Sequence, residues 1–152
     1  MISTIRQFFA ELVGADEPRP FTDDDFRLAA AGLLFHVVAI DGVVSEEERA
    51  KLGELLRHRY GLDADGTAAL VEAAEAADKQ AVDLYGFTSV LKRRLDEEER
   101  ERIVEMMWEL VYADGKVHEF EDNLIWRAAE LLGVSSKARI RLKQAVRANA
   151  GD

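Results

Sequence analysis

A nearly continuous helical repeat of apolar residues constrains this chain more than any other feature. Apolar side chains recur every three to four residues along most of the 152 residues, and runs that alternate apolar with polar residues are missing. The only prolines are Pro18 and Pro20, and Ala, Leu, Glu and Arg, which all favour helix, dominate the composition. The sequence therefore predicts an all-α fold in a single domain over residues 1–152, long enough to bury a sizeable core.

Capping residues and glycines divide this pattern into about seven to eight helices. Thr22 with Asp25, Ser45 with Glu48, and Asp96 with Glu99 have the spacing of capping boxes, and Phe21 with Phe26 has that of a hydrophobic staple. Asp63 is expected to cap a further helix, and Gly61 and Gly133 to end two others. The expected helices cover about residues 2–13, 22–41, 45–61, 63–78, 82–95, 96–114, 119–132 and 136–148.

Two of the helix breaks resemble each other. The segments VAIDGVVSEEER and VYADGKVHEFED both contain Asp-Gly, at Asp41 and Asp114, which are 73 residues apart. In each copy a valine follows two residues after the glycine, and a glutamate, Glu48 or Glu121, follows seven residues after the aspartate. Aligning the aspartates also pairs apolar positions: Val37 with Leu110, Val38 with Val111, Val44 with Val117, and Leu52 with Ile125. We expect two helix–turn–helix units related by a pseudo-twofold axis within a compact bundle.

The repeated acids allow two interpretations. Capping alone explains Glu48 and Glu121, because acids in the first turn of a helix are stabilised by its dipole. Asp41 and Asp114 instead lie at helix C-terminal ends, where the dipole disfavours an anion. Either these aspartates cap their turns through free backbone N–H groups, or they hold a divalent cation together with Glu48, Glu121 and the exposed helix carbonyls. Such oxygen donors favour calcium or magnesium over zinc.

The short pattern itself has little specificity. Asp-Gly followed by valine and glutamate matches part of a calcium-binding EF-hand loop, but apolar residues occupy the first and third ligand positions in both copies, which excludes an EF-hand. Asp65, Gly66 and Glu72 have the same spacing within a segment predicted to be mostly helix. The segments around Asp41 and Asp114 are therefore identified as related by their shared flanking residues, rather than by the short pattern alone.

Composition excludes several functions. The net charge of −10 argues against a nucleic-acid partner, and the absence of cysteine excludes disulfides, thiolate metal sites and thiol redox chemistry. No apolar run is long enough for a membrane span, and the N-terminal residues lack the features of a secretory signal, so we expect a cytoplasmic protein. Residues 137–152 carry five basic residues and one acidic residue. We expect this basic C-terminal helix, about residues 137–148, to be solvated or to suit its helix dipole; a docking surface for an acidic partner is the alternative.

Catalytic motifs are missing from the sequence, and we do not expect an enzyme. His36, His58 and His118 lack metal-ligand spacing, and neither a nucleophile elbow nor a phosphate-binding loop is present. His36, among apolar neighbours, is expected to be a core or boundary residue with a satisfied side chain, and His58 to serve the dipole of its helix. The aromatic residues have the spacing of core or interface positions.

Three segments together resemble the TerB-like tellurite-resistance family. They are AIDGVVSEEER, DLYGFTSVLKRRLDEEERERIVEMMWELV and YADGKVHEFEDNLIWRAAELLGVS, and the resemblance covers about residues 22–136. It implies a compact all-helical fold, a role in bacterial stress response, and acidic residues that bind metal, which match Asp41, Glu48, Asp114 and Glu121 here. The helix expected at residues 2–13 and the basic helix at about residues 137–148 lie outside it.

The family name does not imply that the chain acts on tellurite. Tellurite is a thiol-reactive oxyanion, and this chain is strongly acidic and has no thiol. Two alternative functions are consistent with these features. The first is a metal-binding helical module in the stress response, with a divalent cation at the two turns. The second is a protein-interaction or scaffold domain whose turn acids only cap helices. Either function implies a protein partner, and a homodimer is one form that this interaction could take.

Overall fold

The computed structural model describes residues 25–149, apart from 41, 43, 82 and 113–118. The described part of the chain is all-α, as predicted, and contains no strand. Its helices are α2 (Phe26–Val38), α3 (Glu46–Tyr60), α4 (Ala64–Gln80), α5 (Tyr85–Arg94), α6 (Glu97–Val111), α7 (Glu119–Leu132) and α8 (Ser136–Asn149). None of these helices is long and apolar enough to cross a membrane. The helix expected at residues 2–13 and the staple residue Phe21 lie outside the described residues.

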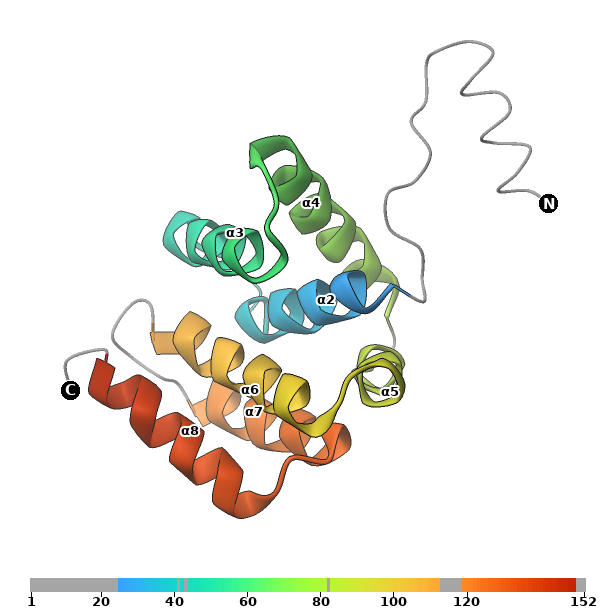
Figure 1. Cartoon of the computed structure of the whole chain (residues 1–152). Helices are drawn as coiled ribbons and strands as arrows, with labels where there is room; N and C mark the ends of the chain where they lie inside the picture. The colour runs from blue at the N-terminus through green and yellow to red at the C-terminus, as the bar shows by residue number, and fades with distance from the viewer. Residues whose placement is uncertain (1–24, 41, 43, 82, 113–118, 150–152) are drawn as a thin grey trace, which may run out of the picture.

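Helix α2 lies at the centre of the bundle. It contacts α4 and α3 on one side and α5, α6 and α7 on the other, and α8 covers α6 and α7 (Figure 1). Every residue from Leu28 to Phe35 is buried, as are Val37 and Val38. Helix α2 is therefore apolar around nearly its whole circumference rather than on one face, because five neighbouring helices enclose it.

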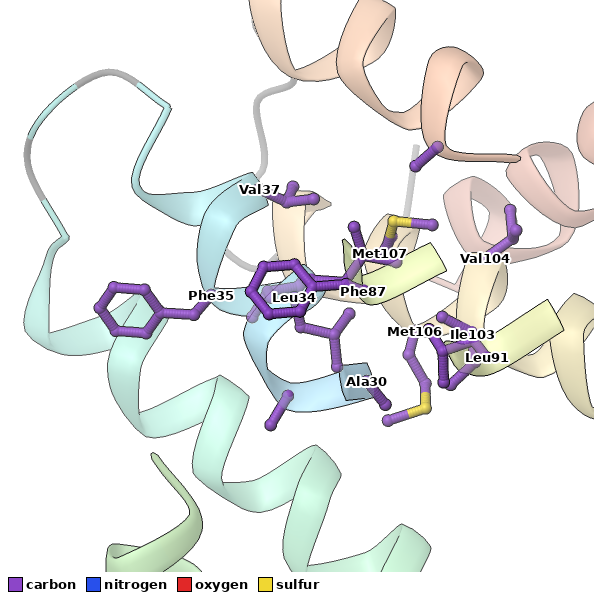
Figure 2. Close-up of a cluster of buried hydrophobic side chains, with 14 of the residues drawn as sticks. Ala30, Leu34, Phe35, Val37, Phe87, Leu91, Ile103, Val104, Met106 and Met107 are labelled. Atoms are coloured by element: carbon purple, nitrogen blue, oxygen red, sulfur yellow. The ribbon is translucent and has the colours of Figure 1, made fainter. Parts of the chain in front are cut away.

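The main core cluster joins α2 to α5 and α6 (Figure 2). Met106 and Met107 of α6 are fully buried, together with Ile103, Leu110 and Val111. Between α2 and α5 the packing is tight at Gly32, where an added Cβ would lie 2.6 Å from the Phe87 ring. A glycine is needed there because the aromatic ring occupies the space that a side chain would take.

The predicted caps are present at the starts of α3, α4 and α6. In α3 the Ser45 Oγ accepts a hydrogen bond from the Glu48 N–H at 3.0 Å, and the Glu48 carboxylate accepts one from the Ser45 N–H at 3.0 Å. Asp96 and Glu99 form the same reciprocal box at α6, and Asp63 caps α4. Gly61 and Gly133 end α3 and α7 with φ of +62° and +79°, a region that glycine adopts without strain.

Two predicted helix starts were wrong by about one turn. Helix α2 begins at Phe26 with Asp25 as its N-cap, rather than at Thr22, and the Asp25 carboxylate accepts from the Arg27 N–H at 2.8 Å. Helix α5 begins at Tyr85 rather than near residue 82, and its first N–H donates to the Asp83 carboxylate at 2.9 Å. Before α2 several acids compete to cap the helix, and the sequence alone does not rank them. The N-cap of α5 is Leu84, whose side chain cannot cap, so the sequence offers no signal at that position.

Burial in the two repeat units is matched position by position. Val37 and Val38 are fully buried like their counterparts Leu110 and Val111, and Leu52 is buried like Ile125. The pseudo-twofold relation between the units remains a prediction. In Figure 1, α2 and α6 run in the same direction, so the two Asp-Gly segments follow helix ends on the same side of the molecule.

Helix α8 is held by its charges, which are not simply solvated. Arg141 forms an ion pair with Glu101 of α6 at 2.7 Å, and Lys143 forms one with Asp122 of α7 at 2.7 Å. The Lys143 ammonium also lies 4.9 Å from the centre of the Trp108 ring. The alternating basic and apolar residues of this helix thus fit an acidic and aromatic surface within the same chain.

Candidate functional site

Glu48 combines a buried position with a capping role. It is the third residue of α3 and is 8% exposed. One of its carboxylate oxygens accepts the hydrogen bond from the Ser45 N–H that closes the capping box. This observation supports the capping interpretation of Glu48 directly, since the hydrogen bond satisfies a backbone donor that the helix itself leaves unpaired.

Glu121 occupies the equivalent place in α7. It is the third residue of that helix and is 5% exposed, and it interacts with neighbouring groups of the chain. Across the described residues, Glu48 and Glu121 are the only acids that are buried, and Thr88 is the only other buried polar residue. The two glutamates that the repeat spacing identifies in the sequence are thus the same two that are buried in the structure. A carboxylate is rarely buried unless it is hydrogen-bonded, paired or bound to a metal ion.

Asp41 and Asp114 lie outside the described residues, as does the whole segment 113–118. The adjoining Gly42 has a φ of +88° and donates its N–H to the Ala39 carbonyl at 2.9 Å. The first Asp-Gly sequence thus contains a tight turn that requires glycine.

Glu48 and Glu121 belong to different parts of the bundle. Helix α3 packs on α2, α4 and α6, whereas α7 packs on α2, α5, α6 and α8. No group of three or more metal-ligating side chains occurs in the described part of the chain. Any cation at these positions would therefore need further side-chain donors from outside the described residues.

A third acid, Glu109, is electrostatically unusual, although no motif or spacing in the sequence distinguishes it from the other acids. One of its carboxylate oxygens is buried without a hydrogen bond, and the nearest cation, the Arg102 guanidinium, lies 3.8 Å away. Burial raises the pKa of Glu109, and the opposing effect of Arg102 is smaller. The residue lies on the partly buried flank of α6 that faces α3, and that position depends on tertiary packing, which no local pattern indicates.

The histidine prediction is confirmed. Nδ1 of His36 lies 2.6 Å from a carboxylate oxygen of Asp78, which joins α2 to α4 at the boundary of the core. The His36 side chain is 29% exposed and that of Asp78 is 13% exposed. His58 is exposed in the last turn of α3, between Arg57 and Arg59. This position agrees with the prediction that His58 interacts with the C-terminal end of the helix dipole.

These features define a class of protein: a small all-α module with two acid-opened helices, each preceded by an Asp-Gly sequence. More specifically, the chain belongs to the TerB family, because the family model described as tellurite resistance protein TerB matches residues 27–144. The match begins in the first turn of α2 and ends within α8. No curated protein and no solved structure gives a significant match to the chain.

Proposed function

We propose that this chain is a non-enzymatic helical module of the bacterial stress and tellurite-resistance response that binds divalent cations at its two Asp-Gly turns. The observation that carries the proposal is the selective burial of Glu48 and Glu121 among the described acids. Each follows its turn aspartate, Asp41 or Asp114, by seven residues, so that two carboxylates and the helix-end carbonyls are available at each turn. Calcium or magnesium suits such donors better than zinc does.

The cation would act on the stability and shape of the module and would not perform chemistry on tellurite. The chain offers no thiol to a thiol-reactive oxyanion, and its net charge of −10 repels anions. Neutralising two acidic turns would lower the repulsion within the chain and fix the connections α2–α3 and α6–α7. The bound state would then present a defined surface to a partner protein.

The capping box of Glu48 favours a second candidate function. Its hydrogen bonds with Ser45 give the carboxylate a role that needs no metal. In this alternative the module is a protein-interaction or scaffold domain, its turn acids are caps, and cations have no effect on it. The two candidates differ in one measurable property, the dependence of unfolding on cations.

Thermal unfolding after chelation, and then with calcium, magnesium, manganese or zinc added singly, distinguishes them. Binding to the folded state alone raises the free energy of unfolding by about 2.7 kcal/mol at 100 times the dissociation constant. We expect a selective increase that Asp41→Asn combined with Asp114→Asn abolishes. The variant Glu48→Gln combined with Glu121→Gln is expected to weaken the increase.

A matched control exists within the chain. Asp65 and Glu72 have the same spacing around Gly66, but both lie in helix α4 and are exposed. Asp65→Asn combined with Glu72→Gln must leave the cation response unchanged if the response arises from the turns. An equal loss in this control, or no response of the wild-type protein to any of the four cations, would leave the interaction domain as the function.

A further inference from the structure

A groove of about 360 Å³ opens where the start of α2, the end of α4 and the start of α5 meet. Its lining includes Leu28 and Ala29 of α2, Ala77 of α4, and Gly86 and Phe87 of α5. These three helix ends gather on one side of the molecule in Figure 1, which is the side where the chain enters α2. A cavity of this size accommodates one or two large apolar side chains.

The floor of the groove is apolar and well packed. Leu28, Ala29 and Phe87 are 8%, 3% and 9% exposed, so their remaining exposed surface lies at the edge of the core. Gln80 and Asp83 supply the polar rim. An apolar floor with a polar rim, formed between helix ends, is the arrangement that receives the apolar face of an amphipathic helix.

The chain itself contains a segment of matching chemistry close to this groove. Residues 2–13 are predicted to form an amphipathic helix, and their apolar positions include Ile2, Ile5, Phe9 and Leu12 at intervals of three and four residues. Described structure starts at Asp25, the N-cap of α2, and Leu28 and Ala29 of the groove follow within one turn. The predicted helix is therefore connected to the groove along the chain by a short path.

The connecting residues 14–24 are sufficient for the two to meet. Eleven residues span at most about 36 Å when fully extended. A short linker also gives the tethered segment an effective concentration in the millimolar range, so weak contacts suffice for occupancy. The linker, GADEPRPFTDD, is acidic and contains both prolines, which makes it unsuitable as an extension of either helix.

From the groove, its chemistry and this tether we infer that the predicted helix 2–13 docks by its apolar face into the α2–α4–α5 groove of its own chain. Phe8 and Phe9 supply side chains large enough to fill it. This docking is independent of the turn acids, so it holds whether or not the module binds cations. It gives the N-terminal residues a role outside the segment that matches the TerB family.

Paramagnetic broadening in the full-length protein tests the inference. The chain has no cysteine, so Gln80→Cys creates a single attachment point for a nitroxide at the rim of the groove. We expect this label to reduce the amide signal intensities of residues 2–13. The matched control is Gln144→Cys, another exposed glutamine, on α8, from which these signals must keep their intensity.

Blocking the groove must remove the effect. A Cβ added at Gly86, which lines the groove, would meet no atom within 4 Å, so Gly86→Trp starts from open space at the groove. Ala68→Trp, at an exposed position near the opposite end of α4, controls for the added ring. Because Gly86→Trp could also perturb α5, Phe8→Ser combined with Phe9→Ser tests the same contact from the predicted helix.

Each outcome of these labelling experiments either supports or contradicts docking of the predicted helix 2–13. Broadening that is lost in Gly86→Trp and in the double serine variant, and retained in Ala68→Trp, supports docking. Undiminished signals in the Gln80→Cys protein, or broadening that survives both variants, would overturn it. Mixing nitroxide-labelled protein with separate ¹⁵N-labelled protein detects exchange between copies, and broadening that occurs only in this mixture would assign the groove to a second copy and overturn docking within one chain.

Discussion

Tyr60 is a partly buried tyrosine that packs against the start of α2. It is the last residue of α3, and its ring lies edge-on to Phe26 with 6.0 Å between the ring centres. Burial of the phenol raises the pKa of Tyr60 to about 12. The effect arises because the phenolate would be less well solvated at this helix end than in water.

A pH-dependent loss of stability follows from this pKa. The unfolded-state pKa of tyrosine is about 10, so the folded protein holds the proton more tightly than the unfolded chain does. The resulting stabilisation is complete below pH 10 and is lost as the pH rises toward 12, where the folded group also ionises. We expect the free energy of unfolding, measured in urea at increasing pH, to fall over this range by less in Tyr60→Phe than in wild type.

The control for this prediction is Tyr85, whose side chain is largely exposed. Tyr85→Phe is expected to leave the pH dependence as in wild type. A phenolate absorbance titration provides an independent check, since the step near pH 12 should be absent from Tyr60→Phe and present in Tyr85→Phe. An unchanged late step in Tyr60→Phe would show that another group causes it.

At the scale of helices, the contact between α2 and α5 depends on one missing side chain. Gly32→Ala places a methyl carbon 2.6 Å from the Phe87 ring, so the ring or the helix must shift. We expect this variant to lose about 1–3 kcal/mol of stability from overpacking. That loss exceeds the gain of about 1 kcal/mol that alanine gives over glycine in a helix. Urea unfolding at neutral pH measures the difference.

Gly53 provides the matched substitution in α3. An added Cβ there would lie 3.5 Å from the Thr67 methyl group, an ordinary contact distance. Gly53→Ala is therefore expected to stabilise the protein by up to about 1 kcal/mol through helix propensity alone. Equal effects of the two substitutions would refute the interpretation that close packing, rather than backbone freedom, requires glycine at position 32.

Helix starts were predictable where one residue alone could cap. Ser45 and Asp96 each have a glutamate three residues later, so four residues of sequence contain the whole interaction. The start of α2 was wrong because the segment TDDD offers four capping side chains in succession. The choice among them depends on where the core begins, which only the packing of α2 against five neighbours determines.

Within the candidate site, the sequence pattern and the burial in the structure agree on two acids, and the site itself remains a prediction. The repeat selected Glu48 and Glu121 from the other acids through their spacing to Asp-Gly, and burial selects the same pair. Glu109 was missed because its raised pKa arises first from burial, to which the nearby acids Glu105 of α6 and Glu54 of α3 add. A local pattern contains no information about such a meeting of distant segments.

At the scale of the whole molecule, opposite charges are separated along the chain and brought together by the fold. The chain has a net charge of −10, while α8 is basic and packs on α6 and α7 through Arg141 and Lys143. Electrostatic attraction thus helps to hold the last helix against an otherwise acidic bundle. Such attraction is partly screened by salt, more so at the exposed Arg141 than at Lys143.

Removing Lys143 should loosen α8. Lys143→Gln removes both the ion pair with Asp122 and the contact with the Trp108 ring. We expect a loss of about 1–2 kcal/mol in low salt, from a partly exposed ion pair and a cation–π contact together. The loss should shrink in about 1 M salt. Urea unfolding followed by helical circular dichroism measures both values.

Lys137 is the control, because it is an exposed lysine at the start of the same helix. Lys137→Gln removes the same charge from α8 and is expected to change stability by less than about 0.5 kcal/mol. If both variants lost the same amount, the net charge of α8, rather than the specific contacts of Lys143, would hold the helix in place.

The position of α8 also gives the protein a built-in optical reporter. The chain has two tryptophans, and each lies beside a cation of this helix: Trp108 beside Lys143 and Trp126 beside Arg139. Trp108 is 0% exposed, so departure of α8 would bring water to its indole and move its fluorescence emission to longer wavelength. Binding of any ligand or partner that displaces α8 can therefore be detected as a shift in the tryptophan emission of the unlabelled protein.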